Sequence, residues 1–162
     1  MGTVYEKRSI LKIPVKERME VCKSIIKKEK DESLRGEAVW VLGAIASELN
    51  LNDPLRDEIG DLLEFVLIHD NNDVVKHEAA FQIGEYNLKK KISVLVNSAL
   101  NDPSELVRHE AVEALGLIQA FDQRHVLLKA LNDKKDCVRQ TAAFVLKQLD
   151  RLEKAHALNE NK

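Results

Sequence analysis

The amino-acid sequence predicts an all-α fold, an α-solenoid in which four two-helix repeats stack side by side. Of the 162 residues, 32% are charged and only 4% are aromatic, a balance typical of helical chains rich in Ala, Leu, Glu and Lys. Apolar residues recur at helical spacing, and a short unit recurs along the chain. A chain of this length forms one domain with its own core.

The repeated unit begins with a basic residue, which is followed by two variable positions, an alanine and a run of apolar residues. The four copies cover residues 35–43, 76–84, 108–116 and 139–147. Their second positions are Gly36, His77, His109 and Gln140, which lie 41, 32 and 31 residues apart. Periods of this length are typical of helical solenoids. Glycines end the first three copies, where they either end a packed face or relieve crowding.

Each repeat is expected to contain an outer and an inner helix, and the four repeats are placed at 14–49, 53–87, 88–120 and 122–155 within a single domain, 1–158. Polar breaks at 52–54, 70–73, 101–104 and 132–134 separate the helices. In the third repeat, the outer helix covers 92–100, and Pro103 or Ser104 opens an inner helix over 105–119. An extended loop, 47–53, lengthens the first repeat. The last inner helix runs from Asp136 towards Ala157, and the tail 159–162 is expected to fray.

Charge and cysteine content narrow the functional classes. A net charge of -2 argues against a dedicated nucleic-acid partner, because such proteins carry a basic excess. No apolar run approaches the length of a membrane span, so no membrane partner is expected. Cys22 and Cys137 lie far apart without metal-type spacing, which fits a reducing compartment and predicts a cytoplasmic protein.

The pair His77-Glu78 recurs in register as His109-Glu110, one repeat later. Neighbouring helices pack with axes about 8–10 Å apart, so the two imidazoles can meet at one ion between their helices. Two histidines with a carboxylate form the arrangement that non-haem iron centres use. Consecutive residues on a helix point about 100° apart, so at least one of the two glutamates should project away from this ion. The sequence therefore predicts a metal site built from these four side chains.

The repeats resemble HEAT repeats of the short phycobilisome-lyase type, whose pattern is Val-Arg-x-x-Ala-x-x-Ala-Leu-Gly. Residues 107–116 match this pattern at every fixed position, and the resemblance covers about residues 15–152. Further, the chain resembles one half of deoxyhypusine hydroxylase, a HEAT-repeat di-iron monooxygenase with two halves of four repeats. In that family the two central repeats of each half carry His-Glu, as repeats two and three do in this chain.

The second resemblance implies an enzyme with iron as its cofactor. It implies that His77 and His109 bind one iron and that Glu78 crosses to the iron of an opposing half. It places Glu110 on the open side of the metal, near the cationic chain of the substrate. With four repeats instead of eight, the other half must come from a second copy, which predicts a homodimer with a di-iron centre. The implied substrate is a deoxyhypusine side chain on a protein, whose amines Glu78, Glu110 and Glu113 would attract.

Two other functions remain open. The first is a non-catalytic scaffold whose curved surface binds a partner protein. The second is a lyase-type chaperone for a bilin, which only the repeat family favours. Trp40 and Phe81 are expected to pack in the core or at its rim, with a pocket wall as the alternative. Glu113 lies one turn after His109 and either orients its ring or is simply solvated. Both Glu110 and Glu113 are candidates for catalytic residues.

Overall fold

In the computed structural model, residues 10–160 are described, and all their regular structure is helical. This part of the chain contains eight α-helices and two short 3-10 helices. The α-helices are α2 (Val15–Lys28), α3 (Glu32–Glu48), α4 (Leu55–His69), α5 (Asp73–Glu85), α6 (Ile92–Asn101), α7 (Glu105–Leu117), α8 (Arg124–Ala130) and α9 (Asp136–Glu160). The 3-10 helices are η1 (Lys89–Lys91) and η2 (Phe121–Gln123). The predicted all-α solenoid is confirmed.

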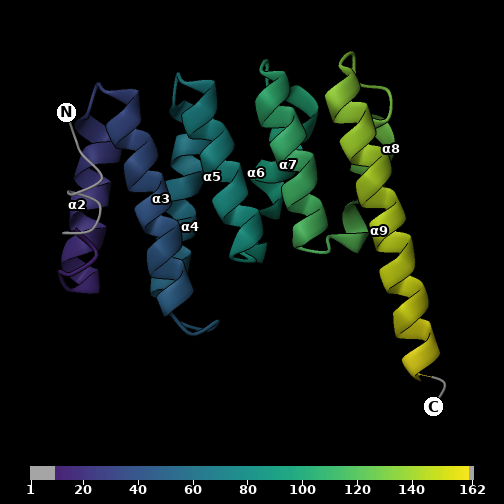
Figure 1. Cartoon of the computed structure of the whole chain (residues 1–162), viewed down its shortest axis with the longest axis horizontal. Helices are drawn as coiled ribbons and strands as arrows, with labels where there is room; N and C mark the ends of the chain where they lie inside the picture. Colours follow the sequence, from purple (N-terminus) through teal and green to yellow (C-terminus); the bar gives the residue numbers. More distant parts are fainter. Residues whose placement is uncertain (1–9, 161–162) are drawn as a thin grey trace.

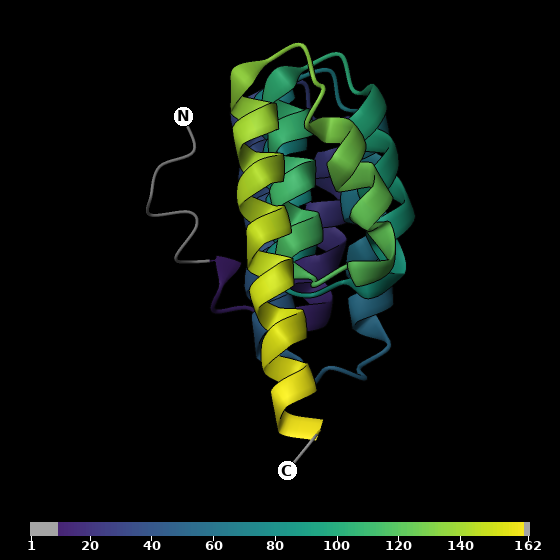
Figure 2. The same ribbon diagram turned by 90° about the vertical axis from the view of Figure 1, so that its right-hand side faces the viewer.

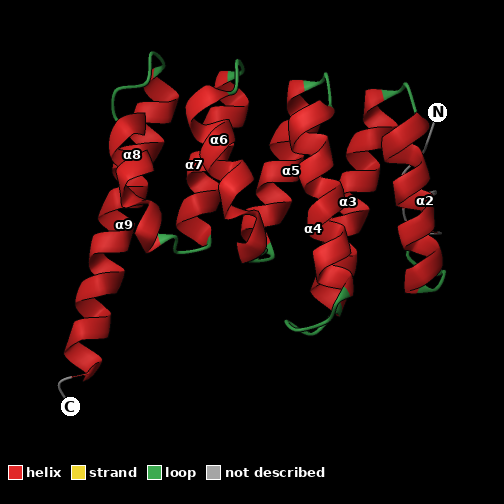
Figure 3. Ribbon diagram, turned by 180° about the vertical axis from the view of Figure 1, so that it is seen from behind, coloured by secondary structure: helices red, strands yellow, loops and turns green. Residues whose placement is uncertain are grey.

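The helices form two layers. Helices α3, α5, α7 and α9 lie side by side in one layer (Figure 1), and α4, α6 and α8 cover them in the view from behind (Figure 3). The view along the stack separates the two layers (Figure 2). Helices α2 and α9 lie at opposite ends of the stack, and α9 extends well beyond its neighbours (Figure 1). Residues 159 and 160 of the tail are helical in α9, and 161–162 lie outside the described residues.

Polar side chains and left-handed residues set the ends of the inner helices. Asn72 Oδ1 accepts hydrogen bonds from the backbone N–H groups of Val74 and Val75 at 2.9 and 3.1 Å, which caps the start of α5. A residue with positive φ lies two positions after the last residue of α5 and of α7, Asn87 (53°) and Gln119 (57°). In each case the backbone N–H groups of this residue and of the next one donate to carbonyls of the last turn, which would otherwise be free.

The glycines of the repeated unit let one inner helix approach the next. A Cβ added at Gly84 on α5 would lie 2.8 Å from the Cα of Ala114 on α7. A Cβ at Gly116 on α7 would lie 2.7 Å from Val145 on α9. Each helix ends one residue after its glycine, and the close contacts with the next inner helix show that these glycines relieve crowding.

Buried ion pairs tie each repeat to the next one. The basic residue that opens each of the first three units contacts an aspartate in the following repeat's interhelical loop. The pairs are Arg35 with Asp70, Lys76 with Asp102 and Arg108 with Asp133. Arg108 makes two hydrogen bonds to Asp133, at 2.8 and 2.9 Å. The repeating basic residue therefore fixes the stagger between neighbouring repeats, and with it the position of one inner helix against the next.

Among residues 10–160, no helix combines the length and the apolar composition that a bilayer span requires.

Candidate metal centre

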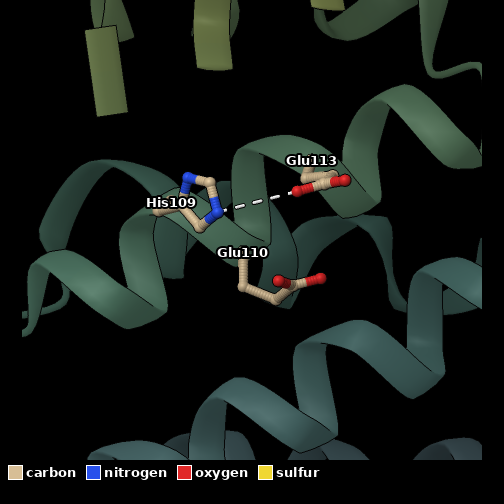
Figure 4. Close-up of side chains that lie close together, drawn as sticks. All are labelled: His109, Glu110 and Glu113. Atoms are coloured by element: carbon tan, nitrogen blue, oxygen red, sulfur yellow. Dashed lines mark ion pairs between the residues drawn. The ribbon is translucent and has the colours of Figure 1, made fainter. Parts of the chain in front are cut away.

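The candidate site lies between α5 and α7, in the middle of the stack. Helix α5 contributes His77, and α7 contributes His109, Glu110 and Glu113. Glu113 follows His109 by one helical turn, so both project from the same face of α7 (Figure 4). The close approach of α5 and α7 at Gly84 and Ala114 brings His77 within reach of α7.

His77 and Glu110 form an ion pair across the two helices. His77 Nε2 lies 2.9 Å from Glu110 Oε2. The hydrogen bond to Glu110 raises the pKa of His77 above its ordinary value, against the opposing effect of burial. Glu110 is only 4% exposed, so its carboxylate is held in a site of low polarity where a positive partner matters most.

His109 uses both ring nitrogens. Its Nε2 lies 3.6 Å from Glu113 Oε2 on the same helix, and its Nδ1 lies 2.7 Å from the hydroxyl of Thr141 on α9. One ligand atom from each of His109, Glu110 and Glu113 lies within 4.8 Å of the other two. Figure 4 shows these three side chains gathered on α7. Three nitrogen and oxygen donors at such separations are close enough to share one cation.

One observation tests whether these residues fit a metal. Glu110 Oε1 is buried and has no hydrogen-bond partner among the described residues, while Oε2 contacts His77. A buried carboxylate oxygen without a donor is costly unless something positive reaches it. The cluster itself offers one imidazole and two carboxylates, from His109, Glu110 and Glu113, and His77 contacts it through Glu110 Oε2. Nitrogen and oxygen donors of this kind suit iron, zinc or a similar ion. The residues therefore fit a metal ion.

Glu78 occupies a different place from the other predicted ligands. Its Oε1 accepts a hydrogen bond from Gln82 Nε2 at 2.5 Å. It lines a groove of about 440 Å³ between α3 and α5, whose wall includes Gly36 and Trp40. Because this groove lies on the α3 side of α5 and the His77–Glu110 pair lies on the α7 side, Glu78 is separated from the cluster. Of Glu78 and Glu110, Glu78 is thus the one that projects away from the cluster.

The structure differs from the sequence-based prediction in the burial of Glu110 and in the part played by Thr141. The resemblance implies that Glu110 lies on the open side of the metal, but the structure buries it between the two histidine-bearing helices. Thr141 was not among the candidates, although it occupies in repeat four the position of Glu78 and Glu110. That register was the signal in the sequence: each of these positions faces the preceding inner helix, as the contacts of Glu110 with His77 and of Thr141 with His109 show.

The other described histidines lie elsewhere. The ring of His69 at the end of α4 packs against Phe65, and the ring of His156 near the end of α9 packs against Phe121. His125 lies exposed on α8. The candidate site is therefore confined to the two histidines that share the repeat register.

Comparison with known proteins defines the class of this chain. The family model for HEAT repeats matches residues 60–150, and the chain belongs to this family. With the stacked helix pairs and the cluster between α5 and α7, it is a HEAT-repeat solenoid with a candidate metal site.

The similar curated proteins are deoxyhypusine hydroxylases. That of Arabidopsis thaliana is 37% identical over 95 residues, which are 57% of this chain and 30% of the relative. That of Candida glabrata is 31% identical over 130 residues, which are 78% of this chain and 40% of the relative. The structure of human deoxyhypusine hydroxylase in complex with glycerol matches with a TM-score of 0.72 at 22% identity, over 88% of this chain and 46% of that one. At this identity the structural likeness shows the fold alone. The chain thus resembles deoxyhypusine hydroxylase but spans less than half the length of these proteins.

Proposed function

We propose that this chain is one half of an iron-dependent monooxygenase that resembles deoxyhypusine hydroxylase. The observation that carries the proposal is the buried Glu110 carboxylate, with one oxygen on His77 and the other without a partner. Repeated similarity to deoxyhypusine hydroxylases supports the kind of enzyme. The His-Glu register of repeats two and three supports the site.

Each side chain has a distinct role in this proposal. His77, His109 and Glu110 would hold the iron from α5 and α7. When bound, the iron would supply the activation of dioxygen that hydroxylation of an unactivated C–H bond requires. Glu113, whose side chain is half-exposed, lies at the open edge of the cluster and would attract the amines of a deoxyhypusine-like side chain. The proposed catalytic residues are thus Glu110, which would hold the metal, and Glu113, which would contact the substrate.

The second half of the site is proposed to come from another copy of this chain. The chain covers 46% of human deoxyhypusine hydroxylase, which matches one half of that protein. A twofold axis between two copies would place their His-Glu pairs face to face and create a di-iron centre. Glu78, separated from its own cluster, would be the ligand that reaches the iron of the other copy. The protein substrate and a cytoplasmic location follow from the same likeness.

The proposal is tested by metal content and mass in solution. The full chain, purified without oxygen and loaded with Fe²⁺, should retain about one iron per chain, as the donor set of each chain predicts. The 18.4 kDa chain should sediment as a dimer. Incubated with dioxygen, a two-electron reductant such as ascorbate and a deoxyhypusine-containing protein, it should add one oxygen atom to that side chain while the other oxygen atom is reduced to water. Mass spectrometry would detect the added oxygen.

Variants separate the site from the scaffold. His77→Ala, His109→Ala and Glu110→Gln should each lower metal affinity by more than about 100-fold, because loss of a direct ligand exceeds the 10–100-fold cost of losing an outer partner. The matched controls are His125→Ala and Glu85→Gln, the same kinds of change at exposed positions on α8 and α5. Wild-type protein that binds no iron, or site variants that bind iron as well as the controls, would refute the proposal.

A scaffold function is the second candidate, and one observation favours it. The position that Glu113 occupies in repeat three carries an aromatic residue in the other three repeats. These residues are Trp40, Phe81 and Phe144, which are 40%, 37% and 67% exposed. An aligned set of exposed aromatic side chains is typical of protein-binding surfaces. Metal-free protein that retains a partner through this row would support the scaffold.

A further inference from the structure

Thr141 on α9 makes two short contacts through a single oxygen. Its Oγ1 lies 2.7 Å from His109 Nδ1 and 2.9 Å from the backbone carbonyl oxygen of Cys137, four residues earlier in the same helix. A threonine hydroxyl carries one proton and can accept through its lone pairs. The carbonyl of Cys137 has no proton to give. Both contacts are hydrogen bonds only if the positions of two protons are fixed.

The first proton belongs to the hydroxyl. Because a carbonyl can only accept, the O–H of Thr141 must donate to Cys137, a bond that helical threonines commonly form with the residue four places back. The hydroxyl oxygen is then left as an acceptor. His109 must therefore donate to it through a protonated Nδ1. A neutral imidazole has one ring proton, so this arrangement leaves Nε2 with a free lone pair.

The free lone pair of His109 faces the acidic side of the cluster. Nε2 lies 3.6 Å from Glu113 Oε2, and the ligand atoms of His109, Glu110 and Glu113 lie within 4.8 Å of one another. His77 serves only Glu110 Oε2, so the Nε2 lone pair, Glu110 Oε1 and the Glu113 carboxylate bring an excess of acceptors to this point, which a cation satisfies. Metal-binding histidines commonly use one nitrogen for the metal and give the other ring proton to an oxygen that fixes the ring.

We propose that Thr141 is the positioning residue of this site, an inference that rests on the proposed metal function. Thr141 holds the ring of His109 in the tautomer that carries its proton on Nδ1 and directs the bare Nε2 at the metal position. In the fourth unit, Gln140-Thr141 stands where the two preceding units have His-Glu. The position that holds Glu110 against His77 in repeat three holds Thr141 against His109 in repeat four. In repeat three the carboxylate of Glu110 is itself a proposed metal ligand, and in repeat four the hydroxyl of Thr141 orients such a ligand, His109.

The test compares Thr141→Val, which has the same shape without the hydroxyl, with Thr141→Ser, which keeps the hydroxyl. Nitrogen-15 NMR of the histidine rings in metal-free full-length protein at about pH 8.5, where an ordinary imidazole is neutral, shows which nitrogen is protonated. In wild type and T141S, His109 should be protonated on Nδ1. In T141V this preference should be lost. The affinity for Zn²⁺ or Co²⁺, measured by calorimetry, should fall about 10–100-fold in T141V and stay close to wild type in T141S.

Two outcomes would overturn the inference. One is a wild-type His109 protonated on Nε2, and the other is T141V protein that keeps both the Nδ1 tautomer and the wild-type metal affinity. Unchanged circular dichroism and melting in T141V exclude a loss of folding as the cause of weaker binding. If wild-type protein binds no metal, the proposed function fails, and the control of the ring by Thr141 stands or falls on the NMR spectra alone.

Discussion

Replacement of Gly84 by alanine should separate the two helices that carry the candidate site. An alanine Cβ at this position would lie 2.8 Å from both Cα and Cβ of Ala114 on α7. Neither atom belongs to a flexible side chain, so the helices themselves must move. Ordinary contact begins near 3.4 Å, so α5 and α7 would part by about 0.6 Å, enough to forfeit a quarter or more of the attraction between packed atoms.

Two opposing terms decide the size of the effect. Alanine is favoured over glycine inside a helix by about 1 kcal/mol, and overpacking of a close contact costs about 1–3 kcal/mol. Gly84→Ala should therefore lower the free energy of unfolding by about 1–2 kcal/mol, because the contact with the Ala114 backbone places the overpacking cost in the upper part of its range. Each kcal/mol corresponds to about 2–4 °C in Tm for a chain of this size.

Gly36→Ala is the matched control. Gly36 lies within α3, and a Cβ there would meet only Val75 Cγ2 at 3.9 Å, an ordinary contact. This variant should gain up to about 1 kcal/mol from helix propensity and raise Tm by about 2–4 °C. Calorimetric melts give the Tm of both variants, and zinc titration gives their metal affinity. Equal stabilisation by the two changes, with unchanged metal affinity in Gly84→Ala, would refute the argument that this contact sets the spacing of the site.

Three further predictions concern ion pairs and a helix cap. His77→Gln should lower the free energy of unfolding of the metal-free protein by about 1 kcal/mol near pH 6, and by progressively less towards pH 9. The pKa of His77 is raised, so its pairing with Glu110 stabilises the fold fully below the ordinary histidine pKa and is lost as pH rises through the raised value. A cost that does not change with pH would contradict this. Asp133→Asn should cost about 2–3 kcal/mol in denaturant melts because it leaves Arg108 buried without its counter-ion, while Asp122→Asn, at an exposed position, should change stability by less than about 0.5 kcal/mol. Asn72→Ala removes the cap of α5 and should cost about 1 kcal/mol, whereas an unchanged Tm would show that the two cap hydrogen bonds contribute nothing.

The histidine-bearing helices show how far the sequence predicts the structure. The apolar period and the break at 101–104 predict an inner helix over 105–119, and α7 covers Glu105–Leu117. The prediction ends two residues late because Gln119 adopts a left-handed conformation (φ 57°), which a helical period does not reveal. The His-Glu register likewise identifies His77 and His109 as neighbours, since equivalent positions of stacked repeats recur side by side.

The roles within the cluster were not predictable in the same way. Glu78 and Glu110 occupy equivalent repeat positions, yet Glu110 is buried against His77 and Glu78 lies in the groove beside Trp40. The difference arises from what the preceding inner helix offers: α5 presents His77 to Glu110, whereas α3 presents Gly36 and a groove to Glu78. A local pattern does not contain this information, because it depends on which side chains the neighbouring repeat brings into contact.

By itself, the sequence determined the repeat, the helical solenoid and the recurrence of His-Glu in two central units, because these depend on spacing along one chain. The tertiary structure alone decided which atom meets which: Glu110 against His77, and Thr141 against His109. The physical reason is that contacts between repeats depend on the stagger of whole helices. That stagger is fixed by distant features, the buried pairs such as Arg108–Asp133 and the close approach at Gly84, and not by the residues of the site.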